Sequence, residues 1–283
     1  MRIFLVRHGE SQSNCDAKLH TLYPDHEIAL SSRGQEQAEY AGEFLKAYLD
    51  KDFLDKKSNT SNRKIESQFQ SLIGNSGISP KFSKDLGDMF KNLLTQHGMN
   101  NAFNVPNNIK LYYSPYRRTR ETSTFMLKAL KPLISEIKED VLLCESQHGL
   151  FDGLEDDEQE KKFPEEFKLF KKTEEHNGKF WARYPHGESP FDVAIRLRQF
   201  FQSLKEDEEN GVSDVICIVH GIVIKVFSMA WLNETPEWYE VERSPGNCAI
   251  RVLEKNKDLG YIYGGHRNGK LWSYPENIKR KTQ

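Results

Sequence analysis

Short apolar runs are the clearest pattern along the chain, and three of them lie at 3–6, 109–113 and 214–219. The first and third hold branched and aromatic residues without the polar alternation of a half-exposed strand. Such runs are typical of strands buried on both faces of a sheet. Further strands, including a closing hairpin, are predicted at 140–144, 248–254 and 259–263.

Segments with apolar residues at helical spacing separate these runs. Ser31 or Ser32 can cap a helix that extends to about Asp50. Strands that alternate with helices predict an α/β fold, here a three-layer α/β/α sandwich around a mostly parallel central sheet. The later helices are predicted at about 115–130, 190–204 and 221–231.

Two stretches interrupt this alternation. Residues 51–108 are rich in Asn, Ser and Lys and contain several Gly and Pro, so they are interpreted as a polar insertion. Residues 150–190 are strongly charged and aromatic, and they predict a lid-like excursion over the sheet. We therefore expect a single domain over residues 1–274, followed by a basic tail at 275–283.

The charge balance argues against polyanionic partners. The chain has 40 basic and 42 acidic residues and a net charge of -2, whereas nucleic-acid and membrane-surface binders carry a basic excess. No apolar run approaches the ~20 residues of a membrane span. The four cysteines lack paired spacing, which is typical of reduced thiols in a cytoplasmic protein. The first strand begins at residue 2, so no signal peptide is expected.

Reactive side chains follow several of the predicted strands. Arg7 and His8 end the first strand, Arg117 and Arg118 follow the second, Glu145 the third and His220 the fourth. Because the carboxyl ends of parallel strands meet at one edge of a sheet, we expect these groups to surround one point. Arginine and histidine together suit a phosphate dianion, and Glu145 would supply a proton donor.

The same residues form motifs whose order resembles the histidine phosphatase superfamily, also called phosphoglycerate-mutase-like. The resemblance covers residues 2 to about 254 apart from the insertion, and it is strongest to the branch of broad-range acid phosphatases. The motifs are RHGES at 7–11 with Asn14, SPYRRTRET at 114–122, Glu145 with Gly149 and Gly153, GES at 187–189, and His220-Gly221.

This resemblance implies that His8 is a nucleophile, forming a phosphohistidine that water then hydrolyses. Arg7, Arg118 and His220 would hold the phosphoryl oxygens, a role for which His220 must be cationic. Gly9 would leave room for the phosphoryl group, and Arg117 would lie beside the site.

Several further polar residues are candidates for roles at the site. Glu145 would protonate the leaving group, with Asp152 as the rival acid. The groups expected to touch phosphate are Ser11, Asn14 and Gly221. A backbone amide near Gly187-Glu188-Ser189, at a helix start, is a further candidate. A loop position without substrate contact is favoured for His148. The histidines at 20, 26, 97, 176 and 266 show no metal-ligand spacing and are expected in solvated loops.

Three functions are compatible with these motifs. They are a metal-independent phosphomonoesterase, a phosphoglycerate mutase dependent on 2,3-bisphosphoglycerate, and a non-catalytic phospho-ligand-binding protein. The phosphatase is favoured because the residues after Glu145 and after His220 differ from the mutase motifs, and because 150–160 is acidic. Its aromatic residues would fix the excursion to the core rather than bind a leaving group. The expected ligand is a small phosphorylated substrate or inorganic phosphate. No metal or other cofactor is expected, and the sequence allows a homodimer.

Overall fold

The computed structural model describes residues 1–50 and 108–272. Nearly all of the predicted insertion, and the tail at 275–283, lie outside these residues. In chain order the elements are β1 (Arg2–Arg7), α1 (Gln12–Cys15), α2 (Leu19–Leu22), η1 (Asp25–Glu27), α3 (Ser32–Leu49), β2 (Ile109–Tyr113), α7 (Arg117–Leu130), η3 (Lys131–Leu133), β3 (Ile134–Glu139), η4 (Val141–Leu143), η5 (Gly149–Phe151), α8 (Asp156–Lys162), α9 (Pro164–Asn177), α10 (Pro190–Glu209), β4 (Asp214–Val219), α11 (Gly221–Leu232), α12 (Pro236–Val241), β5 (Ile250–Glu254), β6 (Lys257–Tyr263), β7 (His266–Arg267) and β8 (Lys270–Leu271).

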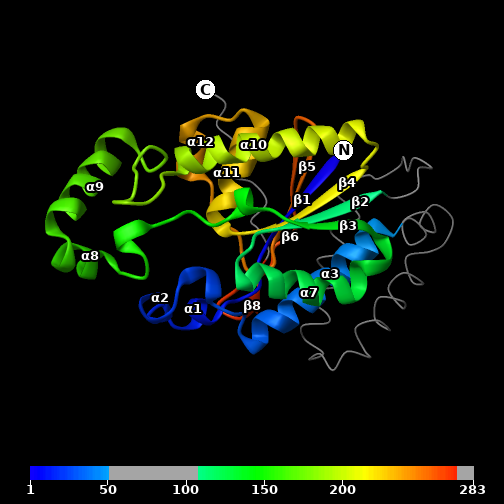
Figure 1. The fold of residues 1–283 in the computed structure, drawn as a ribbon, viewed down its shortest axis with the longest axis horizontal. Helices are drawn as coiled ribbons and strands as arrows, with labels where there is room; N and C mark the ends of the chain where they lie inside the picture. The colour runs from blue at the N-terminus through cyan, green and yellow to red at the C-terminus, as the bar shows by residue number, and fades with distance from the viewer. Residues whose placement is uncertain (51–107, 273–283) are drawn as a thin grey trace.

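The central sheet has six strands in the order β3-β2-β4-β1-β5-β6. β3, β2, β4 and β1 pair in parallel, and the closing hairpin of β5 and β6 adds the antiparallel edge. Helices α3 and α7 cover one face, while α10 and α11 cover the other (Figure 1). The predicted α/β sandwich is therefore confirmed, as are the strands at 3–6, 109–113 and 214–219 and the hairpin.

One strand was predicted in the wrong place. β3 occupies Ile134–Glu139, and the apolar segment after it forms the 3-10 turn η4. β3 is an edge strand whose residues after Ile134 are exposed, so it needs little apolar character. The apolar η4 instead packs Leu143 into the core beside α10. The polar segment 10–30 also holds the short elements α1, α2 and η1.

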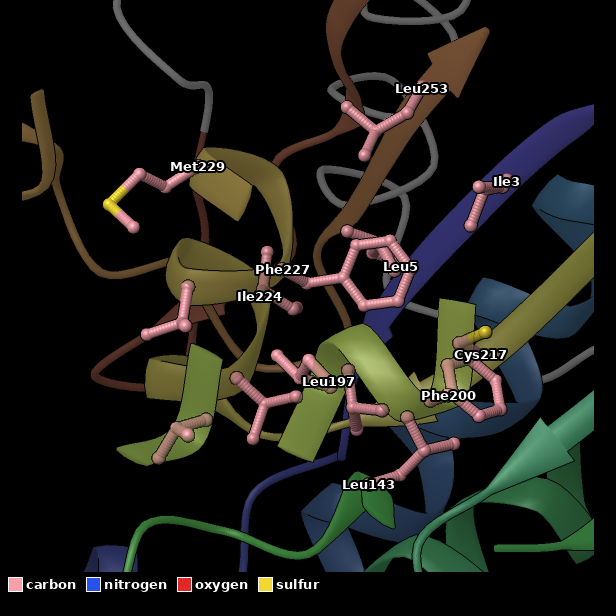
Figure 2. Close-up of a cluster of buried hydrophobic side chains, with 14 of the residues drawn as sticks. Ile3, Leu5, Leu143, Leu197, Phe200, Cys217, Ile224, Phe227, Met229 and Leu253 are labelled. Atoms are coloured by element: carbon pink, nitrogen blue, oxygen red, sulfur yellow. The ribbon is translucent and has the colours of Figure 1, made fainter. Parts of the chain in front are cut away.

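Alternate residues of the buried strands point to opposite faces of the sheet and pack against the two helical layers. Phe4 and Val6 of β1 pack with residues of α3 and α7, whereas Ile3 and Leu5 face α10 and α11. Figure 2 shows Leu5, Phe227 and Leu197 within the second of these cores. Burial on both faces is the physical reason why β1 and β4 lack polar alternation. Among the described helices, none is long and apolar enough to cross a membrane.

The turn after β1 packs tightly against the start of α3. A Cβ on Gly9 would lie 2.4 Å from the carbonyl oxygen of Gly34, and a Cβ on Gly34 would lie 2.0 Å from the carbonyl oxygen of Glu10. The Gly9 amide also donates to Thr122 Oγ1 at 3.0 Å. The lack of a side chain at Gly9 is needed for this packing, and the room that it was expected to leave for a phosphoryl group stays a prediction. The contact fixes the backbone beside His8.

We expect Gly34→Ala to destabilise the protein by about 2 kcal/mol or more, because backbone must move to admit the methyl group. Alanine is the better helix former, so helix propensity acts in the opposite direction. The urea midpoint of unfolding measures the change, with exposed Glu36→Ala on the same helix as control. A Gly34→Ala protein as stable as wild type would contradict the packing described here.

Candidate active site

The ends of β1, β2 and β4 bring the predicted reactive residues together. The amide of His8 donates to the Val219 carbonyl at 2.9 Å, which ties the end of β1 to the end of β4. The rings of His8 and His220 then lie 5.3 Å apart, centroid to centroid. Both rings are buried, with 4% and 0% of the residues exposed. As expected, the carboxyl ends of these strands lie side by side.

The imidazole of His8 is held in one tautomer. Its Nδ1 lies 2.7 Å from the carbonyl oxygen of Gly9, and since a carbonyl only accepts, Nδ1 carries the proton. Burial, together with the positive charges of Arg118 and Arg7, holds the pKa of His8 well below its ordinary value of 6.5. The ring is therefore neutral near pH 7, and Nε2 carries a lone pair.

The second histidine, His220, is linked to the end of β2. Its Nε2 lies 2.8 Å from Ser114 Oγ, and its ring contacts that of Tyr116 edge-on. Burial, then Arg118 and His8, hold the pKa of His220 well below 6.5. The protein's own groups thus favour a neutral ring, contrary to the expected cation. A dianion bound beside it would shift this pKa in the opposite direction.

Arg7 reaches the site from the last position of β1. Its Nη1 donates to the Pro245 carbonyl at 2.7 Å, while Nε is buried without a partner among the described residues. A Cβ on Gly221 would lie 3.6 Å from this Nε, so Arg7 packs along the first residue of α11. An unpaired buried N–H group of a guanidinium is suited to an anionic oxygen.

Arg118, in the first turn of α7, makes an ion pair that the sequence analysis did not foresee. Its Nη1 donates to Asp25 Oδ1 at 2.8 Å and to the Asp25 carbonyl at 2.7 Å, and its Nη2 donates to Asp25 Oδ2 at 3.0 Å. Burial alone would raise the pKa of Asp25, but hydrogen bonds from His20 and Arg118 outweigh it and lower this pKa. The two residues are 93 positions apart, and no motif signals the contact. Arg117 instead pairs with Glu121 at the surface, as expected of a flanking residue.

Two carboxyl groups lie near these cations. Glu145 follows η4, and its Oε1 accepts the Ser146 amide at 3.0 Å. Burial raises the pKa of Glu145 against the opposing effects of that hydrogen bond and of Arg118. Asp152 is more open, with 40% of its side chain exposed, and burial and Asp25 raise its pKa. A raised pKa keeps a carboxyl protonated at higher pH, as a proton donor requires.

The loop after His8 is organised by its own hydrogen bonds. Ser11 caps α1, its Oγ accepting the Asn14 amide at 3.2 Å, while Asn14 Oδ1 accepts the Ser11 amide at 3.1 Å. Asn247 Nδ2 also donates to Asn14 Oδ1 at 3.0 Å. These side chains thus have internal partners. Their contact with phosphate, like that of Gly221, stays a prediction.

The amides at the start of α10 are already used. Those of Gly187, Glu188 and Ser189 donate to Tyr184 O, Gln147 O and Asp192 Oδ2. Ser189 is thus the N-cap of α10, and these amides have partners within the protein. The ring of His148 contacts that of Tyr184 at a tilt, with the centroids 4.5 Å apart.

Other sequence expectations can be compared with the structure. His20 and His266 were expected in solvated loops, but His20 pairs with Asp25 and His266 is buried. The aromatic residues of the excursion were expected to fix it to the core, but most of them pack together in a separate apolar cluster of Leu150, Phe151, Phe163, Phe167, Phe170, Ala182 and Tyr184. Phe180 packs into the core with residues of α10 and α11. The described residues include no group of three or more His, Cys, Asp or Glu side chains placed to hold a metal ion.

Comparisons with curated proteins find relatives along most of the chain. Phosphoglycerate mutase-like protein AT74 of Arabidopsis thaliana is 27% identical over 274 residues, which cover 94% of this chain and 68% of that protein. Broad-range acid phosphatase DET1 of Saccharomyces cerevisiae is also 27% identical, covering 91% of this chain and 86% of the relative.

Solved structures show the same fold at lower identity. YhfR of Bacillus stearothermophilus has a TM-score of 0.56 and 16% identity, and the match covers 95% of this chain and 99% of that one. The mycobacterial glucosyl-3-phosphoglycerate phosphatase Rv2419c, solved with VO3, has a TM-score of 0.54 and 19% identity, with 89% and 90% covered.

The family described as Histidine phosphatase superfamily (branch 1) matches residues 3–67 and 94–262. That match takes in the strand ends bearing His8, Arg118 and His220, together with Glu145. Since it extends over well more than half of the sequence and the fold agrees, this chain belongs to the histidine phosphatase superfamily, branch 1.

Proposed function

We propose that this protein is a metal-independent phosphomonoesterase that acts on small phosphorylated metabolites through a phosphohistidine at His8. The main support is the state of the His8 ring, which is buried and neutral with its proton on Nδ1. Its Nε2 lone pair can attack phosphorus without first losing a proton. The covalent intermediate divides one difficult displacement into two easier ones.

Positive charge for the transition state comes from side chains. Arg7 and Arg118 flank the nucleophile, and Arg7 Nε has no other described partner. Phosphoryl transfer depends mostly on positioning and on such fixed charges, which metal ions supply in many other enzymes. The protein's own groups favour a neutral His220. A dianion that binds next to it would raise the pKa of this ring and stabilise its protonated form.

Glu145 serves as the acid in the first step and the base in the second. Its raised pKa favours the protonated form, which donates to the departing alkoxide as the His8–phosphorus bond forms. The resulting carboxylate then takes a proton from the attacking water, and the phosphorus–His8 bond breaks to release phosphate.

Water is favoured as the acceptor over a second phosphorylated alcohol. Ser146 and Gln147 directly follow Glu145, and Gln147 donates its side-chain amide to the Tyr116 hydroxyl at 2.5 Å. No lysine or arginine therefore stands at 146–149, directly after the acid, to hold the carboxylate of a phosphoglycerate. The name of the relative DET1, a broad-range acid phosphatase, supports the same choice.

The test is phosphate release from a panel of monoesters with and without EDTA. We expect release from p-nitrophenyl phosphate and glycerol 3-phosphate to be unchanged by EDTA, because guanidinium groups replace metal charge. Loss of activity in EDTA would refute the metal-free mechanism. Conversion of 3- to 2-phosphoglycerate that requires 2,3-bisphosphoglycerate would show a mutase instead.

A further inference from the structure

Two aspartates meet beside the phosphate-binding arginine. His20 Nδ1 lies 3.1 Å from Asp25 Oδ1 and 3.9 Å from Asp152 Oδ1. A Cβ on Gly153 would lie 2.4 Å from the Cβ of His20, so α2 and the base of the excursion are in close contact. This packing fixes Asp152 next to Asp25. We call Asp25, Asp152 and His20 the acidic cluster.

The cluster lies next to any phosphate that Arg118 binds. The guanidinium of Arg118 has five N–H groups. The two on Nη1 donate to Asp25, and so does one of the two on Nη2. The Nε–H and the second Nη2–H remain for a phosphoryl oxygen. Phosphate and the Asp25 carboxylate therefore occupy adjacent edges of one planar group. Asp25 therefore lies close to a phosphate on that edge and to the leaving group attached to it.

The charge around Asp152 is mixed, because burial and Asp25 raise the pKa of its carboxyl whereas His20, His148 and Arg118 lower it. Of the groups that lower it, His20 and Arg118 are also paired with Asp25. Arg118 is already neutralised by its two-pronged contact with Asp25. Asp156, by contrast, pairs with Lys171 at the surface of the excursion, and Asp157 is exposed. Asp152, unlike Asp156 and Asp157, is thus joined through His20 to Asp25.

We propose that the acidic cluster is a specificity element, excluding monoesters whose leaving group carries a second anion and admitting those of uncharged or cationic alcohols. This inference rests on the proposed phosphomonoesterase activity. A carboxylate or second phosphate on the leaving group would be repelled by Asp25 and Asp152 across a partly desolvated space. Hydroxyl groups would instead donate hydrogen bonds to the same oxygens.

Glycerol 3-phosphate and 3-phosphoglycerate form a matched pair, since they differ by a hydroxymethyl group in place of a carboxylate. We expect wild type to favour glycerol 3-phosphate by roughly tenfold or more in kcat/KM, the size of one like-charge contact near a protein surface. Asp152→Asn, which leaves the Arg118–Asp25 pair intact, should reduce this preference several-fold. Asp157→Asn, the control, should leave it unchanged.

Binding of both compounds to the His8→Ala protein, measured by calorimetry, gives the preference in ground-state affinity, without turnover. Equal affinity for the two compounds, or a ratio that Asp152→Asn does not change, would overturn the acidic cluster as a specificity element. If the ratio behaves as expected but wild type releases no phosphate from either compound, the hydrolase proposal fails while the cluster stands as a ligand selector.

Discussion

His8→Ala is expected to abolish phosphate release, with a loss of about four orders of magnitude or more, as for other covalent nucleophiles. At the strand ends, His8 offers a neutral imidazole nitrogen, Nε2, while the Gly9 carbonyl holds the ring proton on the opposite side. His220 lies beside it, but Nε2 of that ring is engaged with Ser114. The same variant should also lose the acid-labile phosphoenzyme formed on brief incubation with substrate.

The measurement is steady-state release of phosphate from glycerol 3-phosphate, combined with acid-quench trapping of labelled enzyme. Exposed His176→Ala provides the matched control and should retain both signals. Because His8 is buried, thermal unfolding of the variant checks that the fold survives. Labelling retained in a folded His8→Ala protein would place the nucleophile elsewhere.

Glu145→Gln should slow glycerol 3-phosphate hydrolysis by about 10²–10⁴-fold, the usual contribution of a general acid. Its effect on p-nitrophenyl phosphate should differ, because p-nitrophenolate leaves without protonation. With that substrate the first step remains fast and hydrolysis of the phosphohistidine becomes slow. A burst of p-nitrophenol in stopped-flow absorbance is therefore expected.

The pH profile of kcat/KM gives a second measure of the same residue. The pKa of His8 lies below 6.5, so activity rises with pH as that ring loses its proton on the acid side of neutrality. Burial places the pKa of Glu145 above 4.5, so activity falls as pH rises through that higher value and the acid is lost. The falling limb should vanish in Glu145→Gln. If Asp152→Asn removes that limb and Glu145→Gln does not, the acid is Asp152.

Much of this fold is readable from local pattern. Strands such as 214–219 are apolar on both faces because helices cover both sides of the sheet. A buried strand can therefore be predicted from its apolar composition. The exception is β3, where exposure at the edge removes the signal. The more apolar η4 then resembled a strand, although it is a turn that packs a single buried leucine into the core.

The position of the reactive centre could also be predicted from the sequence, because it depends on where the buried strands end. Arg7 is the last residue of a buried strand, and His8 and His220 directly follow buried strands, so the topology of a parallel sheet is enough to place them together. Glu145 was placed at the correct edge even though the strand before it was misplaced, since β3 and η4 are consecutive. Its role, and those of Ser11 and Asn14, stay predictions.

The sequence by itself determined the sheet, its covering layers and the residues at the strand ends, because each depends on burial or on strand order. Tertiary structure alone decided that Asp25 pairs with Arg118 and that His20 lies between Asp25 and Asp152. It also decided that Gly9 packs against Gly34 with no space for a Cβ. These contacts link segments far apart in the chain. They depend on distances of a few ångströms between packed elements, and neither hydropathy nor spacing along the sequence records such distances.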